Sequence, residues 1–189
     1  MDLKMMRILM IPLTRIPQDF LDKVIDRISK RIECDVEVWP EIIGIPMEFY
    51  NFNRAQYDSM KVLKWLDSKF AFTDVGKIIG LADVDAYVEG LNFVFGHAIL
   101  SGRTAIVYLK RLKSEFYGEE NTKKLLTRTV KEVLHELGHT LGLEHCGNRK
   151  CVMSFSNSVL DVDFKEDKFC TMCSDKLKVK GVNVKDSLL

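Results

Sequence analysis

Apolar residues in the first part of the chain recur at spacings that predict a strand, a helix and a second strand. The run from Met1 to Pro12 predicts a buried strand, and Pro12 and Arg15 end it before the length of a signal peptide or a membrane span. Between residues 17 and 32 the apolar side chains return every three or four positions, which indicates an amphipathic helix. The apolar run over 36–39 completes a strand–helix–strand unit.

The middle of the chain alternates between apolar runs and segments rich in turn-forming residues. Residues 44–54 predict a loop, and residues 55–70 carry apolar side chains at helical spacing. Further strands are expected over 78–82, 83–87 and 104–109. Glycines interrupt residues 91–99, which predicts an irregular or edge strand because glycine weakens a central one. We therefore expect helices that pack on a β-sheet.

A long helix is expected from Thr122 to Gly142, where apolar residues again recur every three or four positions. It carries the run His135-Glu136-Leu137-Gly138-His139. Histidines four residues apart project from one helix face, one turn apart, so both imidazoles can reach a single Zn²⁺. This pair predicts a metal site on the helix.

A third histidine, His145, follows His139 by six residues and cannot share the same straight helix face. Gly142 can supply the necessary sharp turn at little steric cost. Three neutral imidazoles leave zinc an open position for water, and Glu136 would act as the general base that takes its proton. The alternative, a chance match whose histidines are ordinary surface or core residues, is disfavoured by the added glycine and third histidine.

Four cysteines crowd into the last quarter of the chain as two close pairs across an eighteen-residue gap: Cys146, Cys151, Cys170 and Cys173. This spacing favours a tetrahedral structural zinc over a disulfide framework or a redox Cys-x-x-Cys, so we expect two Zn²⁺ ions per chain, one catalytic and one structural. Free thiols also favour a cytoplasmic protein. Cys34 stands alone and predicts a buried core thiol rather than a redox or latency role.

Composition bounds the remaining possibilities. The 189 residues are 47% hydrophobic and 29% charged, which fits one compact domain over 1–189 without repeats or a linker. A net charge of +1 offers no basic excess for phosphate binding, so neither a nucleic-acid partner nor a Cys₄ nucleic-acid module is expected. No membrane partner is expected either, and the oligomeric state is left open.

The run from His135 to His145 is the metzincin motif, and its continuation through Cys146, Cys151-Val152-Met153 and Cys170-Thr171-Met172-Cys173 resembles the archaemetzincin family of zinc metallopeptidases. The resemblance is strong over 135–173 and looser at 83–85 and 93–96. It implies an α+β, two-lobed zinc-protease fold with a mixed, mostly parallel sheet. The upper lobe, 1–142, would hold the helices and the active-site helix, and the small lower lobe, 143–189, would hold His145, the Met-turn and the Cys₄ zinc.

The resemblance also assigns roles after the helix. Met153 falls where the family has its Met-turn, a hydrophobic floor beneath the three histidines, although an ordinary core methionine would pack similarly. Many metzincins carry a tyrosine shortly after this turn, whereas the run Ser154-Phe155-Ser156 has none. A transition-state stabiliser beyond zinc and Glu136 is therefore unassigned.

The predicted function is zinc-dependent hydrolysis of peptide bonds in peptides or small proteins, with the edge strand near 93–99 pairing to extended substrate. A zinc-stabilised peptide-binding module with little or no turnover is the alternative, but such a module has no need of Glu136. His97 either lines the cleft or is structural. Substrate-binding residues are unknown. The sequence also leaves open whether the enzyme is an endopeptidase or an aminopeptidase. An aminopeptidase would need an acidic group near the zinc to bind the substrate amine, and the candidates for it, Asp83, Asp85 and Glu144, are more simply explained as structural.

Overall fold

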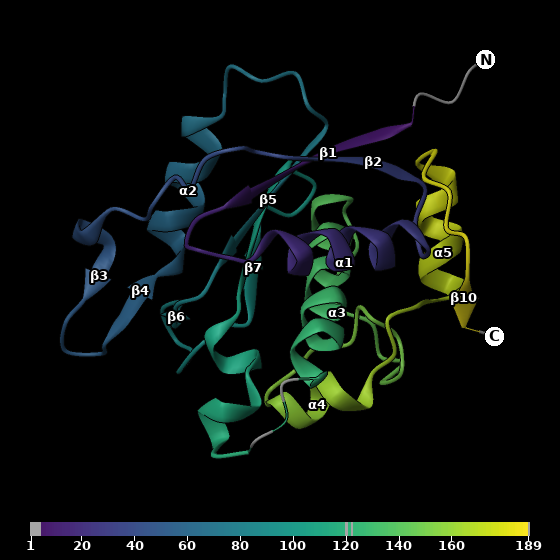
Figure 1. Cartoon of the computed structure of the whole chain (residues 1–189). Coiled ribbons are helices and arrows are strands. Elements are labelled where there is room, and N and C mark those ends of the chain that lie inside the picture. Colours follow the sequence, from purple (N-terminus) through teal and green to yellow (C-terminus); the bar gives the residue numbers. More distant parts are fainter. Residues whose placement is uncertain (1–4, 120, 122, 189) are drawn as a thin grey trace.

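The structure, a computed structural model, describes residues 5–119, 121 and 123–188. The first four residues of the expected N-terminal strand, and Thr122 at the expected start of the long helix, lie outside these ranges. Within them, helices cover both faces of a five-stranded sheet (Figure 1). The expected α+β architecture is confirmed.

The five-stranded sheet has the order β2-β1-β5-β8-β7. Its strands are Met6–Pro12 (β1), Cys34–Val38 (β2), Lys77–Ala82 (β5), Gly96–Ala98 (β7) and Thr104–Tyr108 (β8). β2, β1, β5 and β8 run parallel, whereas β7 pairs antiparallel with β8 at the edge. The mixed, mostly parallel sheet and the irregular edge strand are therefore confirmed.

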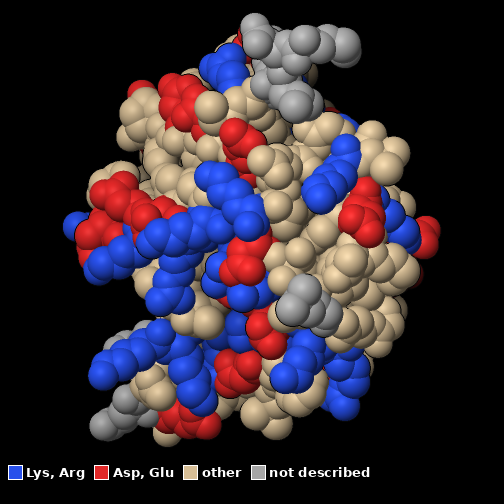
Figure 2. All heavy atoms as spheres, turned by 90° about the vertical axis from the view of Figure 1, so that its right-hand side faces the viewer, with Lys and Arg blue, Asp and Glu red and all other residues tan. Residues whose placement is uncertain are grey.

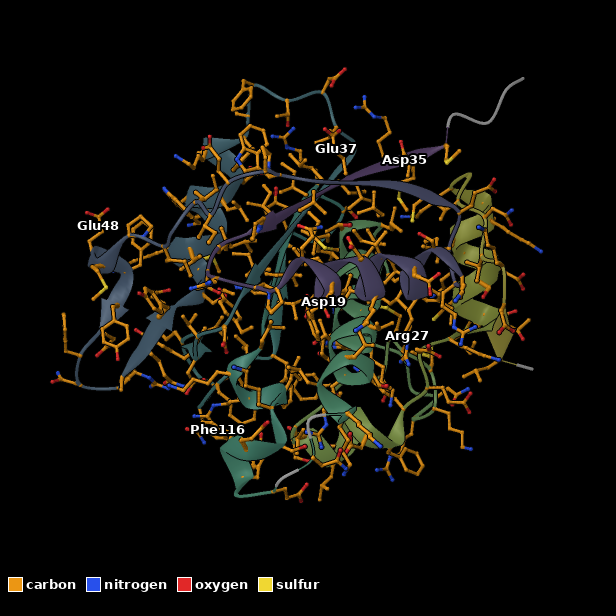
Figure 3. All side chains as sticks on the ribbon, viewed as in Figure 1. Asp19, Arg27, Asp35, Glu37, Glu48 and Phe116 are labelled. Carbon is orange, nitrogen blue, oxygen red and sulfur yellow. The ribbon has the colours of Figure 1, made fainter. Side chains whose placement is uncertain are left out.

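Two helices cover one face of this sheet and a third covers the other. α1 (Gln18–Ser29) and α3 (Lys123–Thr140) share an apolar cluster with the sheet, and α2 (Ser59–Lys69) packs on the opposite face. Arg27, labelled in Figure 3 on α1, donates a hydrogen bond of 2.8 Å to Thr127 of α3. The cluster beneath α1 and α3 continues into residues 141–182, so one core joins α3 to the C-terminal part of the chain.

The helix expected over 55–70 begins later in the structure, at Ser59. Residues Gln56–Asp58 form strand β4 of a second sheet, between β3 (Tyr50–Asn51) and β6 (Ala86–Tyr87). Asp58 then caps α2 by accepting hydrogen bonds from the backbone N–H groups of Met60 and Lys61. The expected loop over 44–54 holds β3 and a 3₁₀ turn at Met47–Phe49.

The sequence alone predicted no helices or strands after Gly142, and residues 143–188, which the structure describes, form four. They are α4 (Val159–Phe164), β9 (Phe169–Cys170), α5 (Thr171–Val179) and β10 (Ser187–Leu188). Before α3, the chain forms two 3₁₀ turns, at Lys110–Leu112 and Ser114–Tyr117. α4 is held to α3 by the buried Arg128, whose guanidinium makes two 2.7 Å hydrogen bonds to Asp163. This contact fixes the segment that leads away from the site.

Charges of both signs are interspersed on the side of the molecule that bears α5 (Figure 2). Asp186, for example, forms ion pairs with both Arg31 and Lys168, at 2.8 and 2.9 Å. The mixed surface agrees with the net charge of +1. Among the described residues, no helix is long and apolar enough to cross a membrane.

Removing the side chain that caps α2 should lower the free energy of unfolding by a measurable amount. We expect Asp58→Ala to lower the free energy of unfolding by about 1 kcal/mol, because two backbone N–H groups lose their acceptor. Asp58→Asn keeps a capping oxygen and should retain most of that stability. Denaturant melts of both variants test this, and equal losses would contradict the capping role.

Candidate active site

The last turn of α3 determines where the third histidine lies. Gly142 adopts a positive φ of 82°, its N–H donates to the carbonyl of His139, and the N–H of Leu143 donates to the carbonyl of Gly138, both at 2.9 Å. This pair of bonds is a Schellman ending, which reverses the chain at a residue that needs no side chain. The predicted helix end at Gly142 is confirmed, and the chain returns to bring His145 beside α3.

The three histidines form one group. Their candidate ligand nitrogens lie within 4.8 Å of one another, and the Nε2 atoms of His135 and His139 are 3.1 Å apart. The Nδ1 atoms of His135 and His139 lie 2.8 and 2.7 Å from the carbonyls of Val152 and Leu143, so each Nδ1 carries the proton and donates. Each Nε2 is then left with its lone pair free, as a metal ligand requires.

The donor set fits zinc. Two nitrogens at about 2.0–2.1 Å from one ion would stand roughly 3 Å apart, close to the separation of these Nε2 atoms. Burial holds the pKa of His135 well below its usual range, and burial also lowers the pKa of His139 and of His145. Burial therefore favours the neutral imidazole, which is the form that binds metal.

A short segment forms the floor under the histidines. Met153 is fully buried, and its sulfur packs so closely under Gly138 of α3 that a side chain at Gly138 would overlap it. The carbonyl of Met153 accepts a 2.9 Å hydrogen bond from the N–H of Cys146, and the neighbouring Val152 carbonyl orients His135. Met153 thus lies against α3, the helix that carries His135 and His139, where the family resemblance expects the Met-turn.

Glu136 faces a cleft of about 750 Å³ that runs between β7, α3 and residues 155–157. Its side chain is 4% exposed, and its carboxylate occupies the space in front of Gly96, where any side chain would overlap it. Burial, and then the nearby charge of Glu132, raise the pKa of Glu136 well above its usual value. A carboxylate with a raised pKa is a better proton acceptor.

The four cysteines form a second group, and all are buried and unpaired by disulfides. Their sulfurs lie within 4.8 Å of one another, with 3.8 Å between Cys146 and Cys170. A tetrahedron of Zn–S bonds near 2.3 Å has sulfur separations of about 3.8 Å, so the group fits zinc. A hydrogen bond from the Cys173 thiol lowers the pKa of Cys151 to about 5, which favours the thiolate that binds metal.

Other candidates from the sequence lie in different settings. Asp85 is paired with Arg111 and Asp83 with Lys113, and neither carboxylate is among the cleft-lining residues. Glu144 and His97 do line the cleft. The Nδ1 of His97 lies 3.1 Å from the hydroxyl of Ser59, so its ring is also held structurally.

Sequence reasoning missed three features of the cleft. Gly96 makes room for the Glu136 carboxylate, Glu132 lines the wall, and Lys165 lies behind Glu132. Glu132 precedes Glu136 by four residues and therefore shares its helix face, which was a usable signal. The contacts with Gly96 and Lys165 join distant segments and leave no mark in local periodicity.

Fold and site together define a zinc metallopeptidase: a cleft with a sheet edge on one side, and a helix whose two histidines and glutamate meet a third histidine across a glycine turn. A family model described as Peptidase family M54 matches residues 5–179. The chain belongs to this family, and its similar proteins are archaemetzincins.

Two relatives and two solved structures illustrate the similarity. The archaemetzincin of Methanocaldococcus jannaschii is 46% identical over 78% of this chain and 80% of its own length. That of Sulfolobus acidocaldarius is 43% identical over 94% and 99%. The crystal structure of archaemetzincin from Methanopyrus kandleri has a TM-score of 0.81 at 36% identity, covering 93% and 94% of the two chains. A zinc-dependent peptidase from Methanocorpusculum labreanum has a TM-score of 0.82 at 31% identity, covering 90% and 99%.

The contact between Gly96 and Glu136 can be tested by adding one methyl group. We expect Gly96→Ala to lower kcat/KM for a peptide substrate by roughly 10²-fold, because the carboxylate must move away from its position. Gly147→Ala is the matched control, since its added methyl meets nothing within 4 Å. Zinc content and melting temperature are measured alongside, and unchanged kcat/KM in Gly96→Ala would contradict the contact.

Proposed function

We propose that this metallopeptidase hydrolyses peptide bonds with Glu136 as general base, beside a zinc ion held by His135, His139 and His145. The observation that carries the proposal is the convergence of one buried carboxylate and three imidazoles on the same cleft. When bound, zinc would lower the pKa of a water molecule and polarise the substrate carbonyl. Its positive charge would also favour the ionised form of the Glu136 carboxyl.

Glu136 would move the proton. Its carboxylate accepts a proton from the attacking water and passes it to the leaving amine as the peptide bond breaks. The limited exposure of this side chain keeps bulk water from competing for that proton. The contact with Gly96 and the helical backbone of α3 restrict the carboxylate to the cleft side of the helix.

The edge strand would hold an extended substrate. β7 is hydrogen-bonded to β8 along one side only and lines the cleft with the segment before it. An extended peptide or a segment of a small protein can pair with such an edge through backbone hydrogen bonds. This pairing would present the scissile bond to Glu136.

A second zinc ion would bind Cys146, Cys151, Cys170 and Cys173, which supports a total of two per chain. It would organise a lower lobe, 143–189, beneath an upper lobe, 1–142, within a single metallopeptidase domain. Thiols kept free for zinc fit a reducing, cytoplasmic compartment. Gly142 and Met153 would support the catalytic zinc through the turn and the floor.

The competing function is a zinc-stabilised module that binds peptides with little or no turnover. Both functions use the same three imidazoles and the same edge strand. They differ in what they require of Glu136, because binding alone needs no proton acceptor beside the metal. Family membership favours turnover, and the test on Glu136 decides between the two.

Replacing Glu136 by Gln keeps the size of the side chain and removes the proton acceptor. We expect peptide cleavage by Glu136→Gln to fall by roughly 10²- to 10⁴-fold while zinc content is unchanged, because the proposed ligands are intact. Peptide-library digestion read by mass spectrometry and metal analysis are run on the variant and the parent. Equal cleavage by both would refute the mechanism, loss of metal would make Glu136 a ligand, and a parent that cleaves nothing would favour the binding module.

The structural zinc should matter more for stability than the catalytic one. We expect two zinc ions per chain in protein purified without chelator, and a larger drop in melting temperature for Cys170→Ser or Cys173→Ser than for His145→Ala. A structural site can contribute on the order of 10 kcal/mol to folding, whereas α3 forms much of the catalytic site without metal. One zinc per parent chain, or unchanged melting in both cysteine variants, would exclude the Cys₄ site.

A further inference from the structure

The charges that line the cleft are of one sign. Three glutamates, Glu132, Glu136 and Glu144, are among the lining residues, and no lysine or arginine is, within the part of the chain that the structure describes. Glu144 is exposed beside His145, whereas Glu132 is 3% exposed. A buried carboxylate is costly unless it is paired, so the groups that could pair with Glu132 must be identified.

Glu132 has a cation behind it but an incomplete set of hydrogen bonds. The ammonium of Lys165, itself 1% exposed, lies 2.9 Å from its Oε1 and forms an ion pair. Oε1 is fully buried and has no further hydrogen-bond partner among the described residues. Lys165 also donates to the carbonyl of Ser154, and it is not itself a cleft-lining residue. The other oxygen, Oε2, accepts no hydrogen bond from a described residue and is not among the fully buried atoms. Because Glu132 lines the cleft, Oε2 is the oxygen with acceptor capacity for a ligand there.

If the proposed function holds, the position of Glu132 places it near the substrate residue on the C-terminal side of the scissile bond. Glu136 returns its proton to the leaving amine, so the residue that carries this amine must lie against Glu136. Glu132 is one turn back along α3, about 5–6 Å away on the same face. The side chain of the residue directly after the scissile bond can reach it.

We propose that Glu132 is a specificity-determining residue, which accepts hydrogen bonds from a lysine or arginine side chain directly C-terminal to the cleaved bond. The aromatic ring of Phe155, which also lines the cleft, would pack against the alkyl part of that side chain. Lys165 pairs with Glu132 from the side away from the cleft, so Glu132 has a counter-ion when no substrate is bound. A positively charged substrate side chain would then bind Glu132 in addition to Lys165, and would not displace Lys165 from the ion pair.

A purely structural role for Glu132 makes a different prediction. α3 also grips the segment around α4 through Arg128 and Asp163, and the Lys131 ammonium donates to the carbonyls of Val162 and Asp163. If Glu132 were one more tie of this kind, its loss would weaken the fold and slow cleavage of every peptide alike. Recognition instead changes the ratio between peptides.

The test uses three peptides that differ only in the residue after the scissile bond: lysine, norleucine or glutamate. In the parent we expect kcat/KM for the lysine peptide to exceed that for norleucine by about 10- to 100-fold, the scale of a hydrogen bond to a charged group. Glu132→Gln should bring the ratio close to one. Because this change leaves Lys165 buried without a counter-ion, the double variant E132Q/K165M, which removes both charges, should give the same ratio in a stable protein.

Asp163→Asn is the matched control, since it weakens a tie between α3 and α4 outside the cleft and should leave the peptide ratio unchanged. Calorimetric binding of the same peptides to zinc-loaded Glu136→Gln protein measures recognition without turnover. Equal kcat/KM for lysine and norleucine in the parent, or a preference that survives in E132Q/K165M, overturns the proposal. If the parent cleaves no peptide, the proposed function fails, and the calorimetric preference for lysine alone decides the role of Glu132.

Discussion

The reversal of the backbone at Gly142 is the constraint on which the positions of both the histidine group and the cysteine group depend. α3 by itself can present two imidazoles along one face, and only a sharp turn after it allows a third to approach from the side. The Schellman hydrogen bonds make that turn, and lysine ammonium groups from two other elements bind the carbonyls that the helix leaves free, Lys77 at Thr140 and Lys180 at Leu141. The carbonyls of Thr140 and Leu141 therefore have hydrogen-bond partners although the helix has ended.

The same turn sets the start of the cysteine group. Cys146 follows His145 directly, so the chain passes from the histidine group to the cysteine group across a single peptide bond. Residues 151–153 then return beneath α3, where Cys151 faces the thiols, the Val152 carbonyl orients His135 and Met153 packs under Gly138. Three consecutive residues therefore support three different parts of the site.

Local spacing predicted the parts of the fold that depend on local interactions. The helical period and Gly142 located α3 and its end, and the cysteine spacing located the thiol group, because both patterns follow from geometry within a short segment. The start of α2 was wrong because Gln56–Asp58 pairs with Ala86–Tyr87, far along the chain. The space for Glu136 at Gly96 and the ion pair of Glu132 with Lys165 were also beyond reach, since each joins elements that the sequence does not bring together.

Residues 151–153 contact both the histidine group and the cysteine group, so a change in one group can reach the other through these three residues. Loss of a thiolate from the cysteine group, for example by oxidation to a sulfenic acid, would also disturb the carbonyl that orients His135 and the methionine beneath the helix. Cys151 and Cys173 are 0% and 3% exposed, so an oxidant reaches these two thiols when the C-terminal part of the chain opens locally. The rate at which hydrolysis is lost under mild oxidant thus becomes a measure of how often that part of the molecule opens.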